Sequence, residues 1–174
     1  MDQTALYDLS YGVYLVTVMD GNRPTGCVVN SIMQVTSEPA TVALSVSHNN
    51  YTNGCIAKSG RLAINILPQD ANPKLIGRFG FRSGKDFNKF ESLPYEMVGS
   101  TPVLKTNLCG WLVCEVINRM ETATHTVFLA KVTDGKRTPG KTPMTYAYYH
   151  NVIKGKSPKN APTYQAPGKE KLPR

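Results

Sequence analysis

The side chains best suited to chemistry are small, uncharged hydrogen-bonding groups that follow an apolar run. Residues 43–56, ALSVSHNNYTNGCI, hold Ser45, Ser47, Asn50 and Thr52 but no Asp, Glu, Lys or Arg. Short hydroxyl and amide groups suit a phosphate or a polyol chain, because both ligands need many hydrogen bonds at short range. The same residues are also typical of a strand that ends in a turn and a helix cap.

A second patch of the same kind is the pair Asn30 and Ser31, set between the apolar residues VV and IM. Two such patches on neighbouring strands can converge on one ligand, and they also suit the edge of a flavin ring, which presents alternating donors and acceptors. The alternative interpretation is that Asn and Ser mark a bulge in a strand. The pattern by itself favours that plainer interpretation, because short motifs often match by chance.

The sequence lacks a catalytic constellation made of protein side chains. It contains no Gly-x-Ser-x-Gly, no His-Glu-x-x-His and no glycine-rich phosphate loop, and neither His48 nor His125 has an obvious carboxylate partner in sequence. Hydrolytic chemistry therefore has no residues to carry it. A bound cofactor removes this difficulty, because the cofactor carries the reactive atoms while the protein supplies position and electrostatics.

The four cysteines predict neither a metal site nor a disulfide framework. They form no Cys-x-x-Cys pair, and the three histidines lie far apart in the sequence. Cys27 and Cys114 lie inside apolar, strand-like runs, where a thiol usually behaves as a small hydrophobe. We expect buried thiols.

The composition is that of one folded domain. The chain has 174 residues, of which 41% are hydrophobic and 18% charged, and this is long enough to bury a core without disulfides. No apolar run approaches the roughly 18–20 residues that span a bilayer, and the N-terminus lacks a secretory signal, so we expect a cytoplasmic protein without a membrane partner.

The net charge of +8 is concentrated toward the C-terminus. Residues 154–174 are rich in Lys and Pro and have almost no apolar periodicity, which predicts a basic tail or linker after a domain of residues 1–153. We expect no nucleic-acid partner, because aromatic interleaving and a nucleic-acid-binding fold are both missing.

Strands outnumber helices in the expected elements. Helices are expected at residues 2–10, 50–60 and 71–81, with Asn50 or Thr52 as the cap of the second; strands at 11–19, 25–35, 40–46, 61–67, 108–121 and 125–135; and a weaker extended segment at 95–100. Many strands without βαβ alternation predict an antiparallel barrel with helical excursions.

The ordered motifs of this chain resemble those of the flavin reductase-like family. They are the Asn30-Ser31 pair, the Glu38-Pro39 turn, the run SVSHNNYT, the strand SGRLAINIL, and later FRSGKDFNKFE and THTVFLAKVTDG. The resemblance covers roughly residues 5–150. It implies a mainly β fold, an antiparallel split β-barrel with a few short helices, that binds FMN in preference to FAD.

The resemblance also implies a set of FMN contacts. Asn30 and Ser31 would contact the isoalloxazine ring, Ser45, Val46 and Ser47 the ring edge and ribityl chain, Asn50, Tyr51 and Thr52 the phosphate, and Arg82, Ser83 and Lys85 the phosphate from another side. Phe87 would pack beside the cofactor or anchor its loop, and no metal is implied.

One departure concerns the electron donor. Relatives that use NADH commonly show Gly-Asp-His before the late strand, and this chain reads Ala123-Thr124-His125. His125 is therefore the candidate catalytic residue on the substrate side, and a satisfied strand histidine is the alternative.

Two functions follow from the resemblance. The first is an NAD(P)H:flavin oxidoreductase that passes hydride from NADH or NADPH to flavin N5, and electrons on to free flavin or a redox protein. The second is a non-enzymatic electron carrier of flavoredoxin type. The ending TYAYYHNVIKGKSPKNAPTY resembles the junction in flavoprotein–rubredoxin fusions, which implies rubredoxin as a candidate partner. Members of the family are usually homodimers.

Overall fold

The computed structural model of the chain describes residues 2–164, and antiparallel strands dominate it. The strands are β1 (Tyr14–Asp20), β2 (Arg23–Val29), β3 (Ile32–Ser37), β4 (Ala40–Ser47), β5 (Arg61–Ile66), β6 (Tyr95–Val98), β7 (Thr101–Leu104), β8 (Gly110–Glu121) and β9 (His125–Arg137). The helices are the 3-10 helix η1 (Gln3–Asp8), α1 (Tyr51–Ser59), α2 (Pro73–Phe81) and α3 (Tyr146–Asn151). No helix within residues 2–164 is long and apolar enough to cross a membrane.

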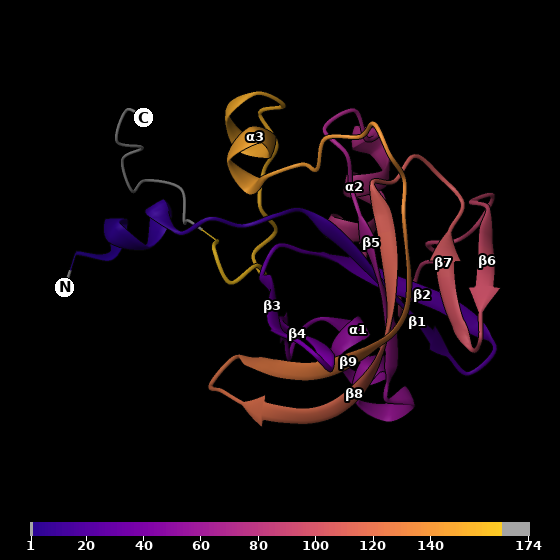
Figure 1. Cartoon of the computed structure of the whole chain (residues 1–174). Coiled ribbons are helices and arrows are strands. Elements are labelled where there is room, and N and C mark those ends of the chain that lie inside the picture. Colours follow the sequence, from indigo (N-terminus) through magenta and orange to yellow (C-terminus); the bar gives the residue numbers. More distant parts are fainter. Residues whose placement is uncertain (1, 165–174) are drawn as a thin grey trace.

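Seven strands form one curved sheet whose two end strands are consecutive in the chain. Their order is β2-β1-β5-β8-β9-β4-β3, every neighbouring pair is antiparallel, and β6 and β7 form a separate hairpin. Because β3 directly follows β2, the sheet must curl until its ends approach each other, as Figure 1 shows. The prediction of a mainly β, antiparallel barrel with few helices is confirmed.

The expected strand over residues 25–35 is wrong, because the chain breaks at Asn30 and Ser31. Up to Val29 the chain pairs with β1, and from Ile32 it pairs with β4 on the opposite end of the sheet. The Ser31 carbonyl accepts a hydrogen bond from Ser45 N at 3.1 Å. The polar pair thus lies where the barrel splits, and it carries the chain from one end of the sheet to the other.

Helix α1 packs against the barrel strands around the main core. Asn50 is its N-cap, since its side chain accepts a hydrogen bond from Thr52 N, and Gly60 ends it in a left-handed conformation with φ of 66°. This settles the choice between Asn50 and Thr52 as cap. The core around α1 consists mainly of Val16, Val18, Cys27, Val29, Val42, Leu44, Val46, Ile56, Leu62, Ile64, Cys114 and Phe128. Cys27 and Cys114 are buried thiols, as predicted.

A second apolar core joins α2 and α3 to the rest of the barrel. Its largest members are Leu15, Leu67, Ile76, Phe79, Phe90, Met144 and Tyr149. The hairpin of β6 and β7 is fastened by Asn65, which donates to Leu15 O at 2.9 Å and accepts from Leu104 N at 3.0 Å. Strand β7 and helix α3 were not expected from the sequence, because four- and six-residue elements are too short for a clear period.

Candidate functional site

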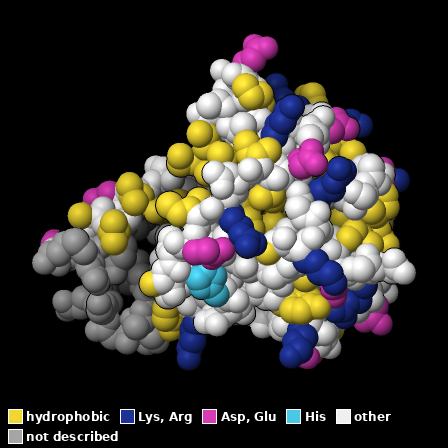
Figure 2. Space-filling view, turned by 90° about the horizontal axis from the view of Figure 1, so that it is seen from below, with side chains coloured by type: hydrophobic (Ala, Val, Ile, Leu, Met, Phe, Trp, Pro, Cys, Tyr) yellow, Lys and Arg dark blue, Asp and Glu magenta, His cyan; other side chains and the backbone are white. Residues whose placement is uncertain are grey.

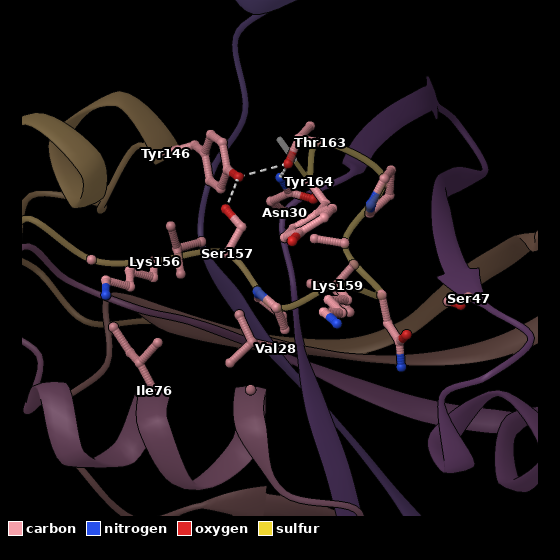
Figure 3. A pocket seen from close by; sticks show the side chains of 18 of the residues that line it. Val28, Asn30, Ser47, Ile76, Tyr146, Lys156, Ser157, Lys159, Thr163 and Tyr164 are labelled. Carbon is pink, nitrogen blue, oxygen red and sulfur yellow. Dashed lines mark hydrogen bonds between the residues drawn. The ribbon is translucent and has the colours of Figure 1, made fainter. Parts of the chain in front are cut away.

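A large cavity opens where the barrel splits, and residues from many parts of the chain line it. They come from η1 and the start of the chain, the ends of β2 and β4, the start of α1, the end of α2 with the loop after it, and residues 146–164 (Figure 3). Its volume is about 1910 Å³, whereas ligand pockets usually measure about 300–1,000 Å³. The cavity therefore has room for a nucleotide cofactor together with a second ligand.

Eight of the thirteen predicted site residues line this single cavity. They are Asn30, Ser45, Val46, Ser47, Asn50, Tyr51, Arg82 and Ser83. They reach it from four separate elements or loops, so the fold brings together groups that lie up to about fifty residues apart in the chain. Ser31, Thr52, Lys85, Phe87 and His125 are not among the lining residues.

The start of α1 is held against two other segments by a small polar network. Tyr51 donates from its hydroxyl to Asp20 Oδ2 at 2.6 Å, and Arg23 donates to the same carboxylate at 3.4 Å and to Gly84 O at 2.8 Å. The hydrogen bond between these two side chains lowers the pKa of Asp20 and raises the pKa of Tyr51. The network fixes the helix N-terminus, with its partial positive charge, beside the segment that carries Arg82 and Ser83.

Gly84 is required by the close approach of this segment to the barrel. A Cβ atom placed there would lie 2.0 Å from Thr25 Oγ1 and 3.4 Å from the ring of Tyr51. Any larger residue would push Arg82 and Ser83 away from α1. The signal was visible in the sequence as FRSGKD, although nothing there identified the residue that the glycine faces.

Thr52 is buried on the core side of α1 instead of facing the cavity. Its hydroxyl makes no hydrogen bond of ordinary geometry with residues 2–164, and its side chain interacts with the buried thiol of Cys27. Desolvation raises the pKa of that thiol. Thr52 is 1% exposed, so its side chain belongs to the interior of the protein.

The loop after α2 divides its residues between the cavity and the solvent. Arg82 lies with its guanidinium carbon 4.4 Å from the centre of the Phe87 ring, a cation–π contact that limits where the guanidinium can point. Phe87 therefore anchors the loop and Lys85 is exposed, with its backbone N bonded to Ser83 Oγ at 3.2 Å. Of the two interpretations of Phe87, the contacts support the anchor.

Lys89 is a cavity-lining cation that sequence reasoning missed. It is 2% exposed, and its ammonium donates to Gly26 O at 2.7 Å and to Phe79 O at 3.0 Å. Burial lowers its pKa, and no carboxylate pairs with it within residues 2–164. Its position between Phe87 and Phe90 in FNKFE was the available signal, because aromatic neighbours on both sides favour burial.

His125 lies one strand away from the cavity wall. It begins β9, opposite Ser47 of β4, and its Nδ1 shares a hydrogen bond of 2.8 Å with Thr124 Oγ1, while Nε2 is buried without a partner among residues 2–164. Next to it, Asn53 of α1 donates to Val46 O at 2.9 Å and to Thr126 Oγ1 at 3.0 Å. This buried amide ties α1, β4 and β9 together.

The remaining walls fit a flat aromatic ring with polar edges. Val28, Ile76 and Phe79 contribute apolar side chains to the lining. In Figure 3, Val28 and Ile76 lie on one side of the cavity and Asn30 lies on the other, with its amide directed toward Thr163. Such a ring needs one dry face and several hydrogen-bonding groups around its rim. The unpaired cations and the small polar groups suit a phosphate at the far end of the same ligand, so the residues present fit a flavin nucleotide.

Comparison with known proteins gives a family and several relatives. The family model described as "Flavin reductase like domain" matches residues 6–156. The high molecular weight rubredoxin of Moorella thermoacetica is 38% identical over 172 residues, which are 98% of this chain and 75% of that protein. The ferric-chelate reductase (NAD(P)H) of Archaeoglobus fulgidus is 32% identical over 166 residues, which are 94% of this chain and 98% of that protein.

A solved structure shows the same fold. The NADH:FAD oxidoreductase of Streptomyces globisporus superimposes with a TM-score of 0.74 at 22% identity, over 84% of this chain and 90% of that one. At this identity the likeness concerns the architecture of the barrel, which agrees with the strand order described above.

Proposed function

Because the chain belongs to the flavin reductase-like domain family, we propose that it is an NAD(P)H:flavin oxidoreductase with FMN as its cofactor. The name of the Archaeoglobus relative, a reductase that uses NAD(P)H and aligns over nearly its whole length, supports this assignment. The main observation behind this proposal is that a single cavity is lined by eight of the residues expected to contact a flavin.

The cavity walls formed by β2, β4, α1 and the loop after α2 hold FMN in this proposal. Asn30, Ser45 and Ser47 supply donors and acceptors for the ring edge and the ribityl hydroxyls. The start of α1 and the Arg82 guanidinium supply positive charge for the phosphate, the former through backbone N–H groups and the helix dipole. One phosphate suffices to use these groups, which is why we favour FMN over the larger FAD.

The chain's own residues position and shield the reactants. When bound, the flavin supplies the redox chemistry by accepting hydride at N5 and giving electrons to an acceptor. The apolar side formed by Val28, Ile76 and Phe79 excludes water from the ring face. The volume left beside a flavin gives NADH or NADPH a place to stack, and His125 would orient the donor from the neighbouring strand.

A second candidate function is that of an electron carrier without nicotinamide chemistry. It is favoured by Ala123-Thr124 in the place of the Gly-Asp that commonly precedes His125, since both residues are exposed in the β8–β9 turn. The name of the Moorella relative makes rubredoxin or another redox protein a reasonable electron acceptor under both functions.

We also propose a homodimer. Strand β3 is an end strand of the sheet, with Met33 63% and Val35 44% exposed, and Ile117 and Met120 of β8 are 53% and 60% exposed. Large apolar side chains on a sheet edge are usually covered in solution, and a second copy of the chain is the commonest cover.

Flavin release tests the cofactor directly. The purified protein should be yellow or become yellow on titration with FMN, bind one FMN per chain, and release FMN on heating. A protein that stays colourless after titration with FMN and with FAD would contradict the assignment, and preferential binding of FAD would correct the cofactor alone.

A further inference from the structure

The C-terminal strap, residues 154–164, forms one complete wall of the cavity. Every one of its eleven residues lines the same space as Asn30 and Arg82. Figure 3 shows it crossing in front of β2, with Lys159 and Thr163 close to Asn30 and with Lys156 over α2 near Ile76. The composition of this segment predicted a tail or linker, whereas the structure places residues 154–164 against the barrel, with Thr163 bonded to Asn30.

Hydroxyl groups fasten the strap to the barrel. Asn30 Nδ2 donates to Thr163 Oγ1 at 2.7 Å, and this hydroxyl donates in turn to Tyr146 OH at 2.7 Å. Tyr146 OH also bonds to Ser157 Oγ. Two ends of the strap are therefore joined to one tyrosine of α3, and through it to a residue expected at the flavin ring.

Backbone packing adds to these contacts at the start of the strap. Gly155 N donates to Tyr149 O at 2.9 Å, and a Cβ atom at Gly155 would lie 2.1 Å from the Tyr149 ring. The Tyr149 hydroxyl donates to Lys156 O at 3.3 Å. A side chain at residue 155 would force the Tyr149 ring to move, so the glycine lets the strap pack directly against this ring and brings Lys156 to the cavity.

The strap brings positive charge to the cavity without ion-pair partners among residues 2–164. It contains Lys154, Lys156 and Lys159 and no acidic residue, and none of the three forms an ion pair within residues 2–164. With Arg82 and Lys89, five cations line the cavity against Asp2 and Asp8. On the face seen in Figure 2, by contrast, Lys and Arg side chains are spread among acidic and apolar ones.

The five cations exceed what one flavin phosphate needs. Arg82 lies beside the start of α1, where we place that phosphate, whereas the strap lysines come from a different segment and have no phosphate assigned to them. A nicotinamide nucleotide brings a diphosphate, and NADPH adds a third phosphate on the ribose. Lysine is a suitable partner for such groups, as a mobile point charge.

We propose that the C-terminal strap is the phosphate-binding wall of the donor subsite, with Lys156 and Lys159 contacting the phosphate groups of the nicotinamide nucleotide. The proposal rests on the proposed function, since it names how the donor of that reaction is recognised. It makes the strap part of the site, held in place by the bonds of Thr163 and Ser157 to Tyr146.

Calorimetric binding of NADP⁺ to the FMN-loaded, full-length protein tests the proposal without any turnover. The double variant Lys156→Gln/Lys159→Gln should bind NADP⁺ at least about fivefold more weakly and with a smaller dependence on salt, because two phosphate contacts are lost. The matched control is Lys131→Gln/Lys136→Gln, which removes two exposed charges of β9 away from the cavity. FMN affinity and melting temperature should stay unchanged in both variants.

A second variant tests whether the position of the strap matters in addition to its charge. Thr163→Val removes the hydroxyl that joins Asn30 to Tyr146 and keeps every charge, so it should also weaken NADP⁺ binding, by about two- to threefold. Affinity of the lysine variant equal to that of the β9 control would overturn the proposal. Wild-type protein that binds NADP⁺ through these lysines but is not reduced by NADPH would refute the proposed function and leave the strap's role standing.

Discussion

The two ends of the cavity are built in different ways. At the α1 end, the groups that would hold the cofactor stand on a helix and a strand whose buried amides and hydroxyls bond to one another, as Asn53 does with Val46 and Thr126. At the strap end, an irregular segment is held by hydroxyls and one glycine contact. We infer that the α1 end is a rigid binding site for the permanently bound cofactor. The strap is a more adjustable wall for the nicotinamide nucleotide, which binds and leaves in each turnover.

Removing Asn53 should give the largest effect on stability. Asn53→Ala leaves Val46 O and Thr126 Oγ1 without their buried donor, which should lower the free energy of unfolding by about 2–3 kcal/mol. Thr163→Val, at the strap end, should change it by less than about 0.5 kcal/mol because Thr163 is partly exposed. Urea unfolding of both apoproteins measures the contrast. Equal losses of unfolding free energy in the two variants would contradict the claim that the α1 end is more rigid than the strap end.

Removing the Arg82 charge should weaken the binding of FMN. Arg82→Gln should cost about 1.5–3 kcal/mol of FMN binding, roughly 10- to 100-fold in Kd, since a charge-assisted contact to phosphate is lost. Lys85→Gln is the matched control, because Lys85 is exposed outside the cavity, and its Kd should change less than about twofold. Fluorescence titration with FMN gives both values. A larger loss in the Lys85 variant would reverse the roles of the two residues.

Substitution of His125 should affect the rate of flavin reduction more than the affinity for FMN. His125→Ala should slow flavin reduction by the nicotinamide nucleotide about tenfold, equivalent to about 1.4 kcal/mol, through poorer positioning of the donor. FMN affinity should remain near normal. Anaerobic stopped-flow reduction is the measurement. An unaltered rate with a lower melting temperature would make His125 a structural strand residue.

Acid should lower the stability of the α1 end by protonating Asp20, and we expect this to be the smallest of the four predicted effects. The folded-state pKa of Asp20 lies below its usual value of 3.8, so its bonds to Tyr51 and Arg23 contribute stability above about pH 4 that is lost as the pH falls further. Asp20→Asn should therefore flatten the acid side of the stability profile below pH 4. Urea midpoints between pH 2 and 7 test this, and an unchanged slope would exclude the contribution.

The sequence predicted those parts of the site that depend on local pattern. The barrel followed from strand-like runs with β-branched residues, and the sequence narrowed the cap of α1 to Asn50 or Thr52, because both features are decided by neighbours in the chain. The structure then showed that Asn50 is the cap. The eight cavity residues were expected from the resemblance to the family's motifs, and their role at a flavin stays a prediction. Thr52 shows the limit, since a residue inside a motif turned to the core when the helix periodicity placed it there.

The parts that sequence reasoning missed depend on contacts between distant segments. Lys89 lines the cavity because it reaches Gly26 O, sixty-three residues away, and no local pattern announces that partner. The strap is positioned through the bond between Asn30 and Thr163, which are 133 residues apart. Its Pro- and Lys-rich composition has little apolar burial to signal a fixed place, so only the assembled fold reveals it.

The oxidoreductase function is tested most directly by anaerobic mixing of the FMN-loaded protein with NADPH and, separately, with NADH, while the flavin absorbance is followed. If the chain is an NAD(P)H:flavin oxidoreductase, at least one of the two nucleotides should bleach the flavin completely, with a rate that saturates as the nucleotide concentration rises. A flavin that stays oxidised with both nucleotides, yet bleaches with a chemical reductant, would contradict this function and leave the electron carrier as the function of this chain.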